Sequence, residues 1–410
     1  MEYGKLNFQI TSSNTNRPLE DVNIRIVNEN EPTTTVAQTK TNADGQIEDI
    51  ELEAPPVEYS MEPSANKPYS EYTLYIDAPG YESVEIGGAE IFSGETAIQN
   101  LSLLPISENN PGSAELFVIP DHTLWGDYPP KIAEDEIKPI DNRDEIVLSR
   151  VVIPEYIVVH DGPPNDSNAT NYYVKYKDYI KNVASSEIYS TWPEATIQAN
   201  VLAIQSFTLN RVYTEWYRNK GYNFTITSST AYDHKWIPGR NVFESISSVV
   251  DELFSNYLSR PNVTQPILTQ YCDGKNVSCP DWMSQWGSKA LGSQGFRAIE
   301  ILRNYYGDSI FINEATEISG IPSSYPGSPL RNGSSGDKVR QMQRQLNVIS
   351  NAYPRIPKIA EDGVFGTQTE NAVKIFQQIF GLDQDGVVGF NTWYKISEIY
   401  VAVSRIAELS

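Results

Sequence analysis

The sequence has few cysteines and lacks any long apolar run. Its 410 residues include two cysteines, Cys272 and Cys279. Two are too few for a disulfide-stapled scaffold or for an all-cysteine zinc site. No stretch approaches the roughly 18–20 apolar residues that a transmembrane helix needs. The start, Met1–Asn7, also lacks the charged and apolar regions of a signal peptide. We therefore expect neither a membrane span nor a signal peptide.

Basic residues are scarce relative to acidic ones. The chain has 31 lysines and arginines against 53 aspartates and glutamates, for a formal net charge of −22. Such a surface repels phosphate backbones and acidic membrane faces, which argues against nucleic acid and membranes as partners. An uncharged or weakly charged polymer such as a glycan is compatible with it. The length exceeds what one hydrophobic core fills and indicates two to four domains.

Residues 1–105 have the pattern of a small β domain. Strand-forming residues concentrate in Asn7–Ile10, Val22–Val27 and Tyr72–Ile76, with turn signals between them. An antiparallel β-sandwich is the expected architecture. We see no catalytic constellation here. Four successive motifs resemble the carboxypeptidase regulatory-like sandwich, which mostly supplies structure or adhesion, and imply a prepeptide: Pro18–Val22, Thr41–Gly45, Tyr72–Leu74 and Ala78–Tyr81.

Residues 106–150 change in character. Repeated prolines exclude a long helix or a central strand, and acidic residues crowd Glu134–Glu136 and Asp141–Glu145. We expect an extended segment that is accessible to proteases, either a plain linker or a propeptide. If it is a propeptide, cleavage is expected close to Arg150, in the region of Ser149, Arg150 and Val151.

Residues 151–318 predict a mixed α/β domain. A strand is expected over Ile153–His160. Helices are expected at Tyr173–Ser190, Pro193–Asn219, Phe243–Leu258 and Ala298–Tyr305. The second of these is apolar on several sides, which predicts a buried helix in the core of the domain.

Residues 330–405 contain an internal repeat, after a boundary rich in glycine, serine and proline at Gly320–Gly336. The loops Glu361–Gly366 and Gln384–Gly389 share the pattern Asp-Gly-Val-x-Gly, and each precedes an expected helix. A further helix is expected around Val339–Ile349. With Gly336–Gln343, the repeat resembles the peptidoglycan-binding type 1 family, a three-helix module that holds wall glycopeptide.

Two segments of the middle domain resemble the stage II sporulation protein D family of lytic transglycosylases. They are Tyr179–Ile188, leading to Trp192–Ala195, and Trp282–Ser288, followed by Ile299–Gly307. The chain departs from the family just before the second segment, where Ser278–Trp282 stands in place of Gly-His-Gly-Val-Gly. Any role of that histidine is therefore lost or moved.

Some relatives in that family hold zinc with one histidine and two cysteines. The counterparts here are Cys272, Cys279 and His234, and nothing in their spacing demands a metal site. A disulfide or two free thiols is the preferred interpretation, and we expect no cofactor.

The order of all the parts resembles the clostridial-type spore cortex-lytic enzymes, over essentially the full length. That family is stored in the dormant spore as an inactive precursor. A subtilisin-like protease removes its N-terminal part during germination. The resemblance implies spore cortex peptidoglycan as the substrate. It also implies deposition around the spore from the mother cell, which needs no signal peptide.

The resemblance further implies a lytic transglycosylase. One carboxyl group is enough for this reaction, first as acid and then as base, because the sugar's own 6-hydroxyl is the nucleophile. Glu187 is the candidate, near the end of an expected helix and beside the small residues Ala184 and Ser185. Partial burial would raise its pKa toward the operating pH. The alternative is a solvated glutamate on a helix surface.

Other residues of the two segments are candidates for substrate binding. Ser284 and Gln285 are expected to hydrogen-bond sugar hydroxyls or acetamido groups. Tyr271, Trp282 and Trp286 are expected to stack on pyranose rings, with core packing as the alternative. Two other functions stay open: an N-acetylmuramoyl-L-alanine amidase, and a non-catalytic scaffold anchored to the wall.

Overall fold

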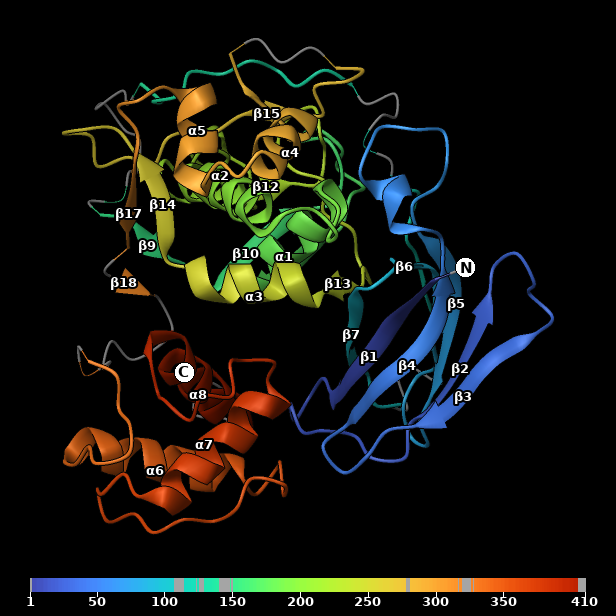
Figure 1. Ribbon diagram of the computed structural model, residues 1–410, viewed down its shortest axis with the longest axis vertical. Helices are drawn as coiled ribbons and strands as arrows, with labels where there is room; N and C mark the ends of the chain where they lie inside the picture. Colours follow the sequence, from blue (N-terminus) through green and yellow to red (C-terminus); the bar gives the residue numbers. More distant parts are fainter. Residues whose placement is uncertain are drawn as a thin grey trace.

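The computed structural model describes residues 2–106, 114–122, 124, 129–139, 148, 150–277, 281–315, 317–318, 326 and 328–404. A β-rich N-terminal part, a central part with helices and short strands, and a helical C-terminal part are arranged around one another (Figure 1). The multidomain, mixed α/β class expected from the sequence is confirmed. No described helix is both long and apolar enough to cross a membrane.

Two sheets form the N-terminal part, in the orders β13-β7-β1-β4 and β3-β2-β5-β6-β8. Side chains alternate between buried and exposed along β1 (Glu2–Ser12), because one face of the strand lies on the core. Two of the pairings, β1 with β7 and β6 with β8, are parallel, so the sheets are not purely antiparallel as expected. The other strands are β2 (Asn23–Asn28), β3 (Thr35–Lys40), β4 (Gln46–Ala54), β5 (Ser70–Asp77), β6 (Val84–Ile91), β7 (Thr96–Leu103) and β8 (Glu115–Val118).

The N-terminal part is joined to the central domain through a shared sheet. Strand β13 (Val242–Phe243) belongs to the central domain and pairs antiparallel with β7. Nearby, the indole N–H of Trp192 donates to the carbonyl oxygen of Ser60 at 3.0 Å. Backbone pairing and a buried indole contact therefore fix the two parts against each other.

The central domain is built around α2 (Glu194–Tyr213), whose side chains are buried nearly all round, as predicted. The other helices are α1 (Tyr176–Glu187), α3 (Glu244–Leu253), α4 (Gln285–Ser293) and α5 (Ala298–Tyr306). The short strands are β9 (Val152–Ile153), β10 (Tyr156–His160), β11 (Asn171–Lys175), β12 (Ile226–Thr227), β14 (Asn256–Ser259), β15 (Tyr271–Cys272), β16 (Met283–Ser284), β17 (Phe311–Glu314) and β18 (Glu317–Ile318).

Several element boundaries differ from the expected ones. Helix α1 begins at Tyr176 rather than Tyr173, because residues 171–175 pair with β10 as strand β11. Helix α2 ends at Tyr213 rather than Asn219. Helix α4 was not predicted from the sequence, although it begins at Gln285, inside one of the two family segments.

The connecting segment, residues 106–150, leads from the N-terminal part to the central domain. Its residues 129–138 are hydrogen-bonded to the central domain. The Ile132 N–H donates to the Ala231 carbonyl oxygen at 2.8 Å. The Gln270 side chain accepts from the Glu134 N–H at 2.9 Å and donates to the Ile132 carbonyl oxygen at 2.7 Å. Residues 129–138 are thus extended, as expected, but they are not the accessible linker that was expected, because the central domain satisfies their backbone groups.

The C-terminal domain consists of α6 (Asp337–Ile349), α7 (Thr367–Ile379) and α8 (Phe390–Ser404). The repeated loops have one structural cause. The Gln343 side chain accepts from the Gly363 N–H at 2.8 Å and donates to Asp362 Oδ1 and to the Val364 carbonyl oxygen, both at 3.0 Å. The second copy repeats these contacts with Gln377, Gly386, Asp385 and Val387. Both glycines have positive φ, 75° and 73°, which disfavours any other residue there.

Candidate active site

Glu187 is the last residue of α1, and its side chain is buried, with 8% of the residue exposed. Both carboxylate oxygens are hydrogen-bonded. Oε1 accepts from the backbone N–H of Lys235 at 2.7 Å, and Oε2 accepts from Nε2 of Gln285 at 3.1 Å. The alternative of a solvated surface glutamate is therefore wrong. The carboxyl group is held in one orientation, as a group that transfers a proton must be.

Gln285 orients Glu187. Its Nε2 donates to the backbone carbonyl oxygen of Glu187 at 2.9 Å as well as to the carboxylate. Because Gln285 is the first residue of α4, this pair connects the end of α1 to the start of α4. The structure thus makes Gln285 a positioning residue, whereas sugar binding was expected.

Tyr271 lies against the same carboxylate and is 1% exposed. Burial, and after it the charge of Glu187, raises the pKa of Tyr271 well above 10.0, so the phenol is neutral and keeps its proton. Its ring stacks on His234, with centroids 5.8 Å apart, and the Nζ of Lys131 lies 4.5 Å from the ring centroid. The stacking of Tyr271 on a pyranose stays a prediction, although His234 and Lys131 already lie against its ring.

Ser284 and Trp286 have structural roles. Ser284 is the N-cap of α4, and its Oγ accepts from the Gly287 N–H at 2.9 Å. Trp286 packs on Trp192, with ring centroids 5.0 Å apart, and its indole N–H donates to the Leu124 carbonyl oxygen at 3.0 Å. For Trp286 these contacts favour the alternative of core packing, and for Ser284 the expected sugar contact stays a prediction beside its capping role. Trp282 is half-buried beside this helix start.

A second carboxylate, that of Asp273, lines the same cavity as Glu187. Its oxygens accept from the backbone N–H groups of Lys275, Asn276 and Val277 at 3.1, 3.4 and 3.0 Å. The side chain therefore closes a turn at the start of this loop. Two carboxylates thus lie at this cavity, Glu187 held by one backbone N–H and one side-chain amide, and Asp273 held by three backbone N–H groups.

The cavity at Glu187 is small and is partly walled by the connecting segment. Its volume is about 50 Å³, enough for a few water molecules and not for a disaccharide. The connecting segment contributes Leu124, Pro129 and Lys131 to the wall. The central-domain wall consists of Ser186, Glu187, Thr230, Lys235, Tyr271, Cys272, Asp273, Val277 and Gln285.

The connecting segment is held there by buried charges. The Nζ of Lys131 donates to the Asp233 carbonyl oxygen. Burial lowers the pKa of Lys131, and the negative charge of Glu187 opposes that shift. Three residues further on, the Glu134 carboxylate accepts hydrogen bonds from both terminal nitrogens of Arg211, at 2.6 and 3.0 Å. Arg211 also donates through Nε to Asp233 at 2.8 Å.

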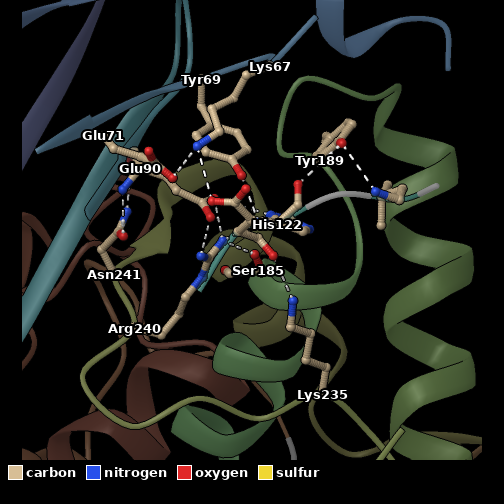
Figure 2. A network of polar contacts seen from close by, with 12 residues as sticks. Lys67, Tyr69, Glu71, Glu90, His122, Ser185, Tyr189, Lys235, Arg240 and Asn241 are labelled. Carbon is tan, nitrogen blue, oxygen red and sulfur yellow. Dashed lines mark hydrogen bonds and ion pairs between the residues drawn. The ribbon is translucent and has the colours of Figure 1, made fainter. Parts of the chain in front are cut away.

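A second buried ion pair joins β6 to the central domain, close to the last turn of α1 (Figure 2). Arg240 donates from Nη1 and Nη2 to the two carboxylate oxygens of Glu90, each at 2.6 Å. Nη2 also contacts Nδ1 of His122 at 3.0 Å and the carbonyl oxygen of Ser185. Although burial opposes it, Arg240 together with His122 lowers the pKa of Glu90 to about 2. Burial lowers the pKa of His122 to about 4.

No motif in the sequence indicates the ion pairs Glu90–Arg240 and Glu134–Arg211. Glu90 and Arg240 are 150 residues apart, and Glu134 and Arg211 are 77 apart, with no shared motif. The one available signal was the presence of charged residues within otherwise apolar surroundings, and that signal does not identify a partner.

The structure describes two of the three zinc candidates, Cys272 and His234. Cys272 is disulfide-bonded and so has no thiolate to offer, which also excludes the interpretation of two free thiols. His234 is buried among aromatic rings, and its Nδ1 lies 3.0 Å from the Tyr179 hydroxyl. Cys279 lies outside the described residues. Among the described residues, no three His, Cys, Asp or Glu side chains gather in a way that could hold a metal ion.

The expected cleavage region is described in part. Arg150 is exposed, Val151 is 5% exposed, and Ser149 lies outside the described residues. Val151 precedes β9, which pairs with β18. A protease thus meets an accessible arginine followed directly by a buried valine.

A wide cleft separates the central domain from the C-terminal domain. Its volume is about 1050 Å³, and its walls include Trp192 and Glu194 of the central domain. Across it lie Asp385, Val387 and Gly389, in the second of the two repeated loops. The N-terminal part contacts the C-terminal domain as well, because Asp44 pairs with Arg355 at 3.2 Å. The repeated loop thus faces the central domain across a space large enough for a polymer segment.

Comparison with known proteins places the C-terminal domain. Residues 335–396 match the family described as "Putative peptidoglycan binding domain". A zinc D-Ala-D-Ala carboxypeptidase of Streptomyces albus G is 36% identical over 87 residues, 21% of this chain and 32% of the relative. An N-acetylmuramoyl-L-alanine amidase, CwlL of Bacillus licheniformis, is 26% identical over 215 residues, 51% of this chain and 56% of the relative.

The chain therefore spans about a third and just over half of these two curated relatives. Among solved structures, the N-terminal domain of SleB is 30% identical and covers 19% of this chain and 99% of its own, with a TM-score of 0.17. The family match includes both repeated loops, whose shared hydrogen-bond pattern is described above. Residues 335–396 thus match a peptidoglycan-binding domain, and this match supports peptidoglycan as a partner of the chain.

Proposed function

We propose that the chain is the precursor of a peptidoglycan lytic transglycosylase that acts on spore cortex. The observation that carries this proposal is the single, oriented carboxyl group of Glu187 in the cavity. A glycosidase that uses water needs two working carboxyl groups, and the second carboxylate at this cavity, Asp273, is bound to three backbone N–H groups. The peptidoglycan-binding domain supports a wall polymer as the substrate.

The reaction then needs no second protein carboxylate. Glu187 in its protonated form gives its proton to the glycosidic oxygen as the bond from C1 of muramic acid to that oxygen breaks. The 6-hydroxyl oxygen of the same sugar forms a new bond to C1, and Glu187, now a carboxylate, takes the hydroxyl proton. The product is a 1,6-anhydromuramic end, and no water is consumed. Gln285 orients the carboxyl group, and the neutral Tyr271 hydroxyl is a donor toward developing negative charge.

The proposal includes storage as a zymogen. Leu124, Pro129 and Lys131 of the connecting segment form part of the wall of the cavity, which is too small for a disaccharide. The ammonium group of Lys131 lies within electrostatic range of Glu187. Cleavage near Arg150 by a subtilisin-like germination protease would separate this wall from the central domain. We place the protein in the spore, around the cortex, as an expectation from the family resemblance.

A second candidate function is an N-acetylmuramoyl-L-alanine amidase. The alignment with the Bacillus licheniformis amidase covers 215 residues, more than the matched domain of residues 335–396 contains. This activity would release stem peptides and create no anhydromuramic ends. The two reactions are therefore told apart by their products.

The test is mass spectrometry of muropeptides released from purified cortex by the full chain, after cleavage at Arg150. We expect anhydromuramic ends from the cleaved wild type and a loss of about 10²- to 10⁴-fold in Glu187→Gln. Asp273→Asn is the matched control, because an amide oxygen still accepts from backbone N–H groups, and it should keep most of the activity. Equal losses in both variants would contradict the role of Glu187. Free stem peptides with intact glycan would favour the amidase.

Activation is tested separately. Sequencing of the new N-terminus after treatment with the germination protease should start within a few residues of Val151. A start far upstream, within the N-terminal part, would leave the wall of the cavity in place and contradict the proposed activation. The uncleaved chain should release no product, although its peptidoglycan-binding domain still binds cortex.

A further inference from the structure

Arg240 is held by a carboxylate that does not belong to the central domain. Its two terminal nitrogens donate to the two carboxylate oxygens of Glu90, at 2.6 Å each, as a bidentate pair. Glu90 is 1% exposed. This planar, two-point geometry is the arrangement by which arginine recognises carboxylate ligands. Glu90 lies on β6, within the part that cleavage near Arg150 would remove.

The two buried arginines at this interface differ in what cleavage would leave them. Arg211 would lose Glu134 but keep Asp233, a carboxylate of its own domain, at 2.8 Å. Arg240 would lose both Glu90 and His122. Among the described residues, the one side-chain hydrogen bond that Arg240 makes within the central domain is to the carbonyl oxygen of Ser185, and its Nε has no hydrogen-bond partner. The ring of Phe243, with its centroid 5.9 Å from the guanidinium carbon, carries no counter-charge. A buried guanidinium without a counter-charge is unfavourable, so the vacated site attracts an anion.

The site adjoins the catalytic group. Ser185, which accepts from Arg240, lies two residues before Glu187 on α1, about 3 Å along the helix axis. Lys235 connects the two places, because its backbone N–H donates to Glu187 while its Nζ donates to the Asp121 carbonyl oxygen, also in the removable part. Figure 2 shows Lys235 and Arg240 on the same side of the network as Ser185. Lys235 lines the cavity together with Glu187 and also lies within electrostatic range of Arg240, so it links the vacated site to the cavity.

We propose that Arg240, with Lys235 beside it, is a carboxylate-binding subsite that takes a stem-peptide carboxylate of the substrate, and that Glu90 occupies it in the precursor. This inference rests on the proposed function for its substrate, since muramic acid carries the stem peptide next to the bond that Glu187 would cleave. The N-terminal part would then inhibit the enzyme in two ways. It forms part of the cavity wall, and the Glu90 carboxylate occupies the site that the substrate carboxylate would take. The subsite would make cleavage depend on the peptide and not on the glycan alone.

The experiment measures binding without turnover. The full chain carries Glu187→Gln and an inserted protease site at Arg150, and the fraction that has lost residues 1–150 is isolated after cutting. The ligands are a soluble muropeptide with free peptide carboxylates and the same muropeptide with those carboxylates converted to amides. We expect the carboxylate form to bind about 10- to 100-fold more tightly. The uncut chain should show no preference.

Substitutions at Arg240 identify the source of that preference. Arg240→Gln should abolish it, and Arg240→Lys should restore a part, because lysine keeps the charge without the bidentate geometry. Since Arg240→Gln would leave Glu90 buried and unpaired before cutting, the double variant Glu90→Gln/Arg240→Gln is made in parallel and should lose the preference too. Equal binding of both ligands by the cut chain, or a preference that survives in the double variant, would overturn the subsite.

The result does not depend on which bond the enzyme cuts. With Glu187 restored, Arg240→Gln should lower kcat/KM for peptide-bearing glycan about 10-fold more than for peptide-free glycan. If the wild type made no anhydromuramic ends while the carboxylate preference held, the transglycosylase proposal would fail and the subsite would stand. If the preference were absent while anhydromuramic ends formed, the subsite would fail alone.

Discussion

The C-terminal domain and the cavity at Glu187 are both held by buried polar contacts, but over very different sequence distances. Gln343 binds a glycine 20 residues away, and Gln377 binds one only 9 residues away. At the cavity, Glu187 and Gln285 are 98 residues apart, and Arg240 and Glu90 are 150 apart. Local contacts leave a motif that a reader of the sequence can recognise. Distant contacts leave none, because their partners share only a place in the fold.

The largest expected loss of stability comes from breaking the Glu90–Arg240 ion pair. Glu90→Ala leaves the Arg240 guanidinium buried without a counter-charge and should lower the free energy of unfolding by about 3–5 kcal/mol. The double variant Glu90→Gln/Arg240→Gln removes both charges together and should cost less than Glu90→Ala. Chemical denaturation of the uncleaved chain, followed by tryptophan fluorescence, measures both. Equal losses in the two variants would mean that packing, and not charge, joins the parts.

The same interface should weaken as the pH falls. The pKa of His122 is lowered by burial from 6.5 to about 4, so the unfolded chain binds a proton on this group more readily than the folded chain does. The contribution of His122 to the free energy of unfolding is therefore fully present above pH 6.5. It is lost as the pH falls toward 4, and the loss is about 2–3 kcal/mol. Below pH 4.5 the protonation of Glu90, whose pKa is about 2, acts in the same direction.

Thermal melting of the uncleaved chain at pH 7, 6 and 5 measures this effect. His122→Asn is the control, because its amide oxygen can accept from Arg240 without titrating. It should weaken the dependence between pH 7 and 5 and leave the part that comes from His234, whose pKa burial also lowers well below 6.5. A wild-type melting temperature that stays constant over this range would contradict the assignment to His122.

The smallest effect is expected within the local contacts. Gln343→Ala and Gln377→Ala each leave a buried glycine N–H unsatisfied and should each destabilise the C-terminal domain by about 1–3 kcal/mol. Because the two side chains bind different loops, their effects should be close to additive. Gln368→Ala, on the exposed surface of α7, is the control and should change little. Hydrogen exchange of the α6–α8 amides measures this domain apart from the rest.

The site was predicted unevenly, for the same reason. The family segments located Glu187 and Gln285, and the structure brings them together at 3.1 Å. The capping role of Ser284 and the packing of Trp286 on Trp192 were not predicted, because a capping serine and a core tryptophan look the same in sequence as sugar-binding residues. Lys131 was not predicted at all. The sequence of its segment is typical of a free linker, whereas in the structure the central domain accepts hydrogen bonds from backbone N–H groups of that segment.

The fold shows the same division. The periodic apolar residues of α2 and the repeated loops of the C-terminal domain followed directly from the sequence. The start of α1 was misplaced, because residues 171–175 find a strand partner in β10, and pairing with a neighbour outweighs local helical preference. Strand β13 has only two residues and exists because β7 of the N-terminal part lies beside it.

From the sequence alone, the mixed α/β class, the buried helix α2 and the repeated loops of the C-terminal domain could be predicted, because periodicity and turn chemistry act over a few residues. Only folding brings together the groups around Glu187: the amide of Gln285, the phenol of Tyr271, the ammonium of Lys131 and the backbone N–H of Lys235. Burial and charge pairing act through space, and they assign a residue its role only after folding has chosen its neighbours.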